Sequence, residues 1–260
     1  MLTSIWKWLL DPAHWSGPNG IPTRTVEHLG YSLVSLLLAI IIAVPLGIVV
    51  GHSGRAKWTV TLANSVRAVP SLGLLFALSM YFGPRIGSNL AFVIPSVIVL
   101  ILLSAPPILS GTYAGLTEVD PAARDAARGM GMTGTEILRK VELPCALPLL
   151  LSGVRSASLQ VIATATIAAS ISLGGLGRFL IDGLARNDYA QMAGGAILVS
   201  LLALLVDGLL ALLQRAVVSP GLTGKFRDNR PVVTTTAGRD NAGASQNPQD
   251  RADDQREALV

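Results

Sequence analysis

Long apolar stretches separated by short polar ones fill most of the first 215 residues of this chain. Five stand out, at about residues 29–50, 62–82, 90–111, 146–173 and 193–213. A helix of about 20 apolar residues crosses the hydrocarbon core of a bilayer and satisfies its own backbone hydrogen bonds there. The pattern therefore predicts an all-α polytopic membrane protein with about five transmembrane helices, within a transmembrane domain over residues 29–215.

Several prolines fall inside the first three of these segments, namely Pro45, Pro70, Pro95, Pro106 and Pro107. Proline removes a backbone donor and clashes with the preceding helical turn. We therefore expect kinks at these positions, with freed carbonyl groups that neighbouring helices or a pathway can cover.

The two ends of the chain have a different composition. Residues 1–28 lack the pattern of a cleavable signal peptide, and Trp6, Trp8 and Trp15 beside Lys7 favour an extracytoplasmic segment at the membrane interface. A frayed terminus is the alternative. Residues 216–260 are polar, mixed in charge and poor in large apolar side chains after about residue 228, which predicts a disordered cytoplasmic tail.

Basic residues between the apolar segments predict the orientation. One set of loops and termini holds ten and the other holds five; the first is Arg55, Lys57, Arg124, Arg128, Arg139, Lys140, Arg215, Lys225, Arg227 and Arg230, and the second is Lys7, Arg24, Arg85, Arg178 and Arg186. Cytoplasmic loops carry the excess of lysine and arginine. The N-terminus is therefore expected outside, and the 118–144 loop and the C-terminus in the cytoplasm.

The amino-acid composition also indicates a membrane protein, and it argues against several kinds of chemical site. Hydrophobic residues make up 51% of the chain and charged residues 14%, whereas about 25% is charged in soluble domains. A single cysteine, Cys145, excludes an internal disulfide, and His14, His28 and His52 are too scattered for a metal site. We expect membrane lipid around the helices, no nucleic acid partner and no bound metal. A membrane-embedded enzyme would need clustered nucleophiles, acids or ligands, which the apolar segments do not show.

The loop at residues 118–144 has strong helix signals. Asp120 followed by Pro121 is typical of a helix start, and we expect a helix to about Met130 with a smooth alanine-rich face. Gly131 permits a sharp change of direction. Such a rigid element suits a loop that receives force from a soluble partner, although a plain helical hairpin would share these signals.

A second short helix is predicted after this turn. Thr133 and Glu136 have the spacing of a capping box, and Pro144 is expected to end the helix.

This loop resembles the EAA loop of binding-protein-dependent ABC importer permeases of the type I, MetI-like class. The family pattern is Glu-Ala-Ala, three residues, Gly, nine residues, then Ile-any-Leu-Pro. Asp125-Ala126-Ala127, Gly131 and Val141-Glu142-Leu143-Pro144 fall at this spacing. Asp125 replaces the usual Glu and Val141 the usual Ile, so the chemistry is kept but the acid is shorter. The resemblance implies that the matching residues of the pattern couple the chain to an ATPase: Asp125, Ala126, Ala127, Gly131, Val141, Leu143 and Pro144.

The resemblance covers about residues 26–213 and is strongest to the glycine betaine, carnitine and choline permeases. Arg67-Ala-Val-Pro70-Ser71-Leu72 resembles their Arg-x-x-Pro-Ser-Leu motif, and Thr164-Ala-Thr-Ile-Ala-Ala with Gly174-Gly175-Leu-Gly resembles another of their segments. Small residues also serve plain helix packing in membranes. The residues expected at a pathway or gate are Arg67, Pro70, Ser71, Phe76, Thr164, Gly174 and Gly175; Phe76 is included because quaternary ammonium groups favour aromatic faces.

The resemblance also implies the partners of a bacterial inner-membrane transport subunit that is not itself an enzyme. A second permease, identical or related, would complete the pathway, an extracytoplasmic binding protein would deliver a small osmoprotectant, and two cytoplasmic ATPases would bind the loops. ATP and Mg²⁺ would be held by the ATPases, since the stretch from Gly221 to Lys225 lacks the spacing of a phosphate-binding loop. An ABC permease for a sulfonate, nitrate or amino acid is the alternative.

Three charged residues fall within or near the ends of apolar segments, where an ionised group is costly. We expect Arg67 and Arg155 near the cytoplasmic ends, where they brace the loop or serve a gate, and Asp207 paired with a basic residue or a helix end. An ion-coupled carrier is a further alternative, because such carriers use an acid near the bilayer midplane. Asp207 is the one candidate for that role.

Overall fold

The computed structural model of the protein describes residues 2–54, 57–88, 90–171 and 173–218. The chain divides into units at residues 1–223 and 224–260, and every described residue belongs to the first unit. The described residues form helices and their connections without a strand. Most of the segment expected as a disordered tail, from residue 219 onward, lies outside the described residues.

Four helices of the described chain are long and apolar enough to cross a membrane. They are α2 (Ile21–Ser53), α5 (Leu90–Thr117), a continuous helix over Gly134–Ile171 that contains α8 (Leu143–Ala168), and α10 (Tyr189–Val217). They confirm the first, third, fourth and fifth predicted segments. Each extends beyond its predicted segment by turns whose residues are more polar, such as the Arg24–Glu27 turn of α2.

The second predicted segment, residues 62–82, is not one continuous helix with a kink. It consists of α3 (Trp58–Ser65) with the 3₁₀ turn η2 (Val66–Ala68), and of α4 (Ser71–Phe82) with the 3₁₀ turn η3 (Gly83–Arg85). The two parts are bent by 86°. The physical reason is Pro70, which disfavours helical backbone at Val69, so that Val69 is extended at ψ 127°. The prolines of α2 and α5, in contrast, remain inside helices.

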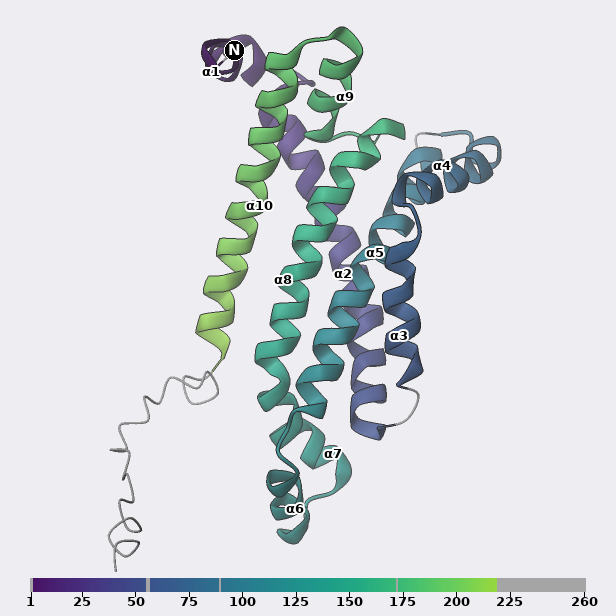
Figure 1. Cartoon of the computed structure of the whole chain (residues 1–260), viewed down its shortest axis with the longest axis vertical. Helices are drawn as coiled ribbons and strands as arrows, with labels where there is room; N and C mark the ends of the chain where they lie inside the picture. The colour runs from purple at the N-terminus through teal and green to yellow at the C-terminus, as the bar shows by residue number, and fades with distance from the viewer. Residues whose placement is uncertain (1, 55–56, 89, 172, 219–260) are drawn as a thin grey trace, which may run out of the picture. The chain divides into compact units, whose positions relative to one another are not determined.

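Helices α2, α5 and α8 pack against one another and form the centre of the described chain (Figure 1). Glycines permit the closest contacts between α5 and α8. A Cβ atom at Gly115 would lie 2.7 Å from the carbonyl oxygen of Ala146, and one at Gly153 would lie 2.6 Å from that of Pro107. Since there is little hydrophobic driving force between helices in lipid, such backbone contact is a main source of packing energy.

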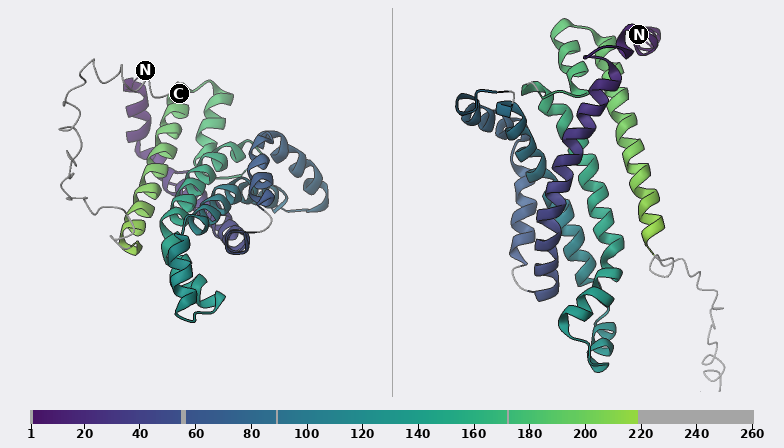
Figure 2. Two further views of the ribbon diagram at one scale, coloured as in Figure 1. Left: turned by 60° about the horizontal axis from the view of Figure 1, so that its bottom comes forward. Right: turned by 180° about the vertical axis from the view of Figure 1, so that it is seen from behind.

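Helix α10 runs along the outside of this group, beside α8 (Figures 1 and 2). Only 6% of its apolar window is buried within the chain, against 56% for α5. Helix α10 therefore presents most of its apolar surface to lipid or to another chain.

Short helices cover the two ends of the membrane-crossing group (Figure 2). At one end lie α1 (Leu2–Leu10), the 3₁₀ turn η1 (Pro12–Trp15) and α9 (Gly177–Arg186). At the opposite end lie α6 (Pro121–Gly129) and α7 (Gly134–Ile137). Trp8 of α1 packs edge-on against Phe179 of α9, so α1 is attached to the rest of the described chain. The placement of this segment at the membrane interface stays a prediction.

Candidate coupling site

The predicted helix of the central loop is present as α6. The Asp120 carboxylate accepts a hydrogen bond from the Ala122 amide at 2.9 Å, which caps the helix as expected. Of the family triad, Asp125 and Ala126 are exposed, and Ala127 is buried against the rest of the chain. The Asp125 carboxylate pairs with Arg128 at 2.9 Å. One side of α6 is therefore anchored, while the other is free for a partner.

Gly131 turns the chain between α6 and α7. Its φ is +81°, in the left-handed region that favours glycine, and a Cβ atom there would have no neighbour within 4 Å. Met130 beside it is 71% exposed, a large apolar side chain at the tip that the sequence analysis did not single out. The tip of the loop thus offers small and apolar surface with open space around it.

The predicted capping box opens α7. The Thr133 hydroxyl accepts from the Glu136 amide, and the Glu136 carboxylate accepts from the Thr133 amide at 3.0 Å. The prediction that Pro144 ends this helix is wrong. Residues 138–142 form a π-helical turn, η4 (Leu138–Glu142), in which the Leu143 amide donates to the Leu138 carbonyl. This wider turn accommodates the missing amide of Pro144, and the helix continues into α8.

Glu142 holds the base of the loop. It is 3% exposed; its Oε2 lies 2.6 Å from Nδ1 of His52, which therefore donates, and its Oε1 lies 2.8 Å from Nε of Arg124. Arg124 also donates a hydrogen bond through Nη2 to the Leu116 carbonyl. The last turn of α2, the loop helix α6 and the π-turn before α8 thus meet at one buried carboxylate, and Arg124 adds the last turn of α5.

Sequence reasoning missed Glu142, because it occupies the unspecified position of the Ile-any-Leu-Pro pattern. An acid beside a run of apolar residues was the available signal. Its burial depends on His52 and Arg124, which are distant in the sequence and come together only in the folded chain. Of the matching residues around it, Val141, Leu143 and Pro144 are half-buried.

The residues expected at a pathway or gate lie in three separate regions. Arg67, Pro70, Ser71 and Phe76 lie at the α3–α4 bend, where Arg67 is exposed and Phe76 is 49% exposed. Thr164 is buried in α8, where Gln160 donates to its hydroxyl at 3.3 Å. Gly174 and Gly175 lie between η5 (Ala169–Ile171) and α9.

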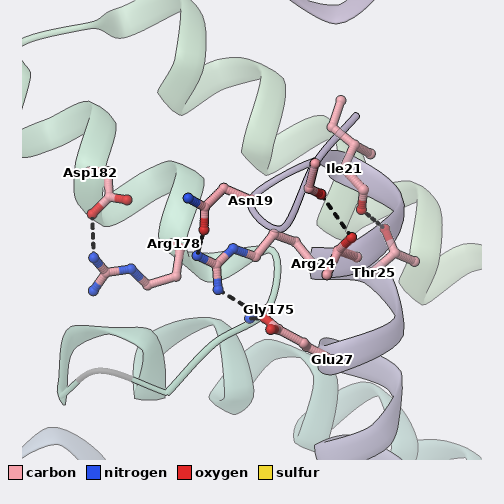
Figure 3. Close-up of polar contacts among 10 residues, drawn as sticks. Asn19, Ile21, Arg24, Thr25, Glu27, Gly175, Arg178 and Asp182 are labelled. Carbon is pink, nitrogen blue, oxygen red and sulfur yellow. Dashed lines mark hydrogen bonds and ion pairs between the residues drawn. The ribbon is translucent and has the colours of Figure 1, made fainter. Parts of the chain in front are cut away.

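Gly174 and Gly175 lie close to α2, and Figure 3 shows the contact of Gly175 with Glu27. A Cβ atom at Gly174 would lie 2.4 Å from the Glu27 carboxylate, and Gly175 has a φ of +87°. The Gly175 amide donates to Oε2 of Glu27 at 2.8 Å, and the same oxygen accepts from Arg24 at 2.9 Å. The glycine pair therefore joins the α8–α9 connection to α2.

Arg155 and Asp207 connect α8 to α10. Arg155 donates through Nε and Nη2 to the two carboxylate oxygens of Asp207, at 3.0 and 2.7 Å. The predicted pairing of Asp207 is confirmed. Arg155 lies near the middle of α8, not near an end as expected, since the helical connection from the loop displaces the start of the span. Gln214 accepts from Arg155 at 3.4 Å and donates to the Pro148 carbonyl at 3.1 Å.

Comparisons with known proteins agree with this architecture. Residues 35–219 match the family model described as binding-protein-dependent transport system inner membrane component. The glycine betaine/carnitine/choline transport system permease protein OpuCB of Bacillus subtilis is 36% identical over 202 residues, which are 77% of this chain and 90% of that protein. The osmoprotectant import permease protein OsmW of Salmonella typhimurium is 36% identical over 219 residues, 82% of this chain and 100% of that protein.

The fold also matches solved structures. A chain of the inward-facing MetNI methionine ABC transporter superposes with a TM-score of 0.68 at 23% identity, covering 80% of this chain and 99% of that chain. A chain of an amino acid ABC transporter superposes with a TM-score of 0.61 at 20% identity, covering 75% and 93%. From the family match and these relatives, this chain belongs to the binding-protein-dependent transport system inner membrane components, and it is a multi-pass permease subunit of an ABC importer.

Proposed function

We propose that this permease carries a small osmoprotectant with a quaternary ammonium group, such as glycine betaine, choline or carnitine. The observation that supports this is the pair of relatives above, which align over most of both chains; one is named for glycine betaine, carnitine and choline, and the other for osmoprotectants. We further propose that the N-terminus lies outside and the α6–α7 loop in the cytoplasm, as the basic residues suggest.

The α6–α7 loop of this chain is proposed to bind one cytoplasmic ATPase subunit. A second permease subunit would bind a second ATPase in the same way. The exposed Asp125, Ala126 and Met130 and the open turn at Gly131 supply the contact surface. Arg124 and Glu142 supply the connection: α6 is linked to α2 through Arg124, Glu142 and His52, and to α5 through the hydrogen bond from Arg124 to the Leu116 carbonyl. ATP and Mg²⁺ would bind to the ATPase subunits. In response, this chain would open its pathway to one side of the membrane or to the other.

The Asp207 carboxylate argues against an ion-coupled carrier. Such a carrier needs an acid that binds and releases its ion during transport. In this chain both oxygens of Asp207 are held by Arg155, which suits a structural joint between α8 and α10.

The test of the substrate is uptake of labelled glycine betaine after osmotic upshift, in cells with and without this gene. Choline, carnitine, taurine and methionine serve as unlabelled competitors. Loss of uptake on deletion, with inhibition by the quaternary amines alone, is the expected result. Inhibition by methionine or taurine instead would contradict the proposed substrate. Uptake that stops when the proton gradient is collapsed while ATP is kept would contradict ATP coupling.

The coupling role of the loop is tested at Gly131. We expect Gly131→Arg to abolish uptake while the protein still reaches the membrane, because a bulky cation at the tip blocks ATPase binding. Gly131→Asn is the control for backbone strain, since asparagine tolerates positive φ. Uptake by Gly131→Arg at the level of Gly131→Asn would contradict the coupling role.

A further inference from the structure

A polar cavity of about 470 Å³ lies at the end of the molecule that carries α1 and α9. Its polar lining comes from the segment before α2, from the first turn of α2, from α9 and from the first turn of α10: Ser16, Asn19, Arg24, Arg178, Asp182, Arg186 and Gln191. Trp8 and His14 form part of its wall. The α6–α7 loop lies at the opposite end of the membrane-crossing group (Figure 1).

Three guanidinium groups line this cavity against one carboxylate. Arg178 pairs with Asp182 at 2.8 Å, and Arg24 binds Glu27 and Asn19, at 2.9 and 2.6 Å (Figure 3). Arg186, the last residue of α9, is exposed and makes no ion pair within the described part of the chain. The lining residues together with Glu27 carry three positive and two negative charges, and a further acid, Asp188, lines a neighbouring cavity with Arg186.

The arginines retain donors for a ligand. The hydrogen bonds to Glu27 and Asn19 use Nη1 and Nη2 of Arg24, and that to Asp182 uses Nη2 of Arg178. Their remaining N–H groups, together with all those of Arg186, can donate. The side chains of Arg24 and Arg178 are 17% and 31% exposed, so water screens their charges only in part. Arginine donors of this kind match the oxygens of a phosphate group.

The cavity lies beside the part of the chain that is built for the membrane interface. Helix α1 and turn η1 expose Trp6, Leu10 and Trp15, at 61%, 72% and 50%, next to the cavity wall at Trp8 and His14. Tryptophan and apolar side chains on a short surface helix are typical of the headgroup level of a bilayer. A phosphate group at this level belongs most simply to a phospholipid.

The lining does not suit a quaternary ammonium group, because the faces of its two large aromatic rings are covered: Trp8 and Phe179 are both buried and pack edge-on against each other. The Trp8 ring stacks on His14 with centroids 4.6 Å apart, and Gly194 lies so close to its edge that an added Cβ atom would be 2.3 Å away. Quaternary ammonium groups need an open aromatic face. The cavity is therefore distinct from a site for the proposed solute.

We propose that this cavity binds a phosphate group through Arg24, Arg178 and Arg186, supplied by the headgroup of an anionic phospholipid. The proposal stands independently of the solute carried, since it rests on the charges, cavity and neighbouring aromatic residues alone. A lipid held there would connect α2, α9 and α10 at the membrane surface.

The test uses the full-length chain in a neutral detergent and measures binding by thermophoresis. The probes are dihexanoyl phosphatidylglycerol, dihexanoyl phosphatidylcholine and inorganic phosphate. We expect saturable binding of the phosphatidylglycerol, and an affinity about tenfold lower in Arg186→Gln, the size of one lost charge-assisted hydrogen bond. Arg215→Gln, an exposed arginine at the other end of α10, is the matched control and should leave the affinity unchanged.

The probes distinguish the sources of the phosphate. Tighter binding of phosphatidylglycerol than of inorganic phosphate supports a lipid; equal binding supports the site but with a phosphate from solution. Equal binding of phosphatidylglycerol and phosphatidylcholine, or an unchanged affinity in Arg186→Gln, overturns the proposal. Displacement of the lipid by glycine betaine overturns it as well, because the cavity would then be a solute site.

Discussion

Glu142 contributes to the structure in two ways, since it neutralises Arg124 and orients His52. A carboxylate that is 3% exposed is costly without partners, and these two side chains are the reason it is accepted there. His52 and Arg124 are partly exposed, at 36% and 21%, so a partner that binds the exposed surface of the loop can reach them.

We expect Glu142→Gln to lower the free energy of unfolding by about 2 kcal/mol, because it leaves the Arg124 charge unpaired at a largely buried site. Uptake should fall further than the amount of protein in the membrane, since the loop loses its connection to α2. The measurement is the Tm in detergent, together with uptake per membrane-inserted chain. Glu118→Gln, an exposed acid of the same loop, should change neither value; equal behaviour of the two variants would contradict the role of Glu142.

Arg155 and Asp207 form a bidentate pair between two membrane-crossing helices, and each single charge without its partner would be costly in the bilayer. We expect Arg155→Gln and Asp207→Asn each to reduce the yield and the Tm, and the double variant to recover part of the loss. The double-mutant cycle should give a coupling of about 1–3 kcal/mol. Additive losses would show that the pair does not join α8 to α10.

At the scale of elements, α5 and α8 depend on glycines for their contact. Gly111, Gly115 and Gly153 each face backbone of the opposite helix, where an added Cβ atom would meet an oxygen at 2.7 Å or less. The neighbouring backbone is itself helical and cannot move aside without displacing the whole helix. The close contact between α5 and α8 therefore requires glycine at these three positions.

The prediction for this contact compares two glycines within helices. Gly115→Ala should lower the free energy of unfolding by about 1–3 kcal/mol, as overpacking does in a closely packed core. Gly208→Ala in α10 meets nothing within 4 Å and should be neutral or stabilising by up to about 1 kcal/mol, through helix propensity. Denaturation of both variants in one detergent is the measurement. A destabilisation by Gly208→Ala equal to that by Gly115→Ala would show that the α5–α8 contact is not responsible.

The elements differ in how far the sequence predicts them. Apolar length alone identified four spans, and local capping chemistry identified the start of α6 at Asp120 and of α7 at Thr133. The break at Pro70 was predicted in place but not in size, because the angle depends on what the two parts pack against. Pro144 was misread as a helix end, because the adjacent π-turn that accommodates it has no simple sequence signal.

At the scale of the whole molecule, the contacts between distant segments were beyond prediction. Glu142 and His52 are 90 positions apart in the sequence, and Glu27 and Gly175 are 148 positions apart. The Arg24, Arg178 and Arg186 cavity arises in the same way, from two helices far apart in the sequence. Hydrophobic periodicity and capping patterns depend on residues that are close together in the sequence. These contacts form between residues that come together only in the folded chain, so such patterns do not predict them.

The proposed orientation is a prediction about the whole molecule. In a Cys145→Ser background, a cysteine at Ser16 should react with a membrane-impermeant maleimide on intact spheroplasts, and one at Glu118 only after permeabilisation. Both positions are exposed in the structure and lie at opposite ends of the membrane-crossing group. Labelling of Glu118→Cys on intact spheroplasts would reverse the orientation.

One helix, from Gly134 to Ile171, joins the second half of the loop to a membrane-crossing span. Its 38 residues span about 57 Å at about 1.5 Å per residue, more than the thickness of the hydrocarbon core. A tilt of about 5° about one end would displace the other by about 5 Å over that length. If a partner moved α7, the displacement would be carried along this helix to its other end, near the Gly174–Gly175 turn that contacts α2. The second half of the loop and the span are one continuous helix, and the π-helical turn at residues 138–142 is the segment of it in which bending is expected.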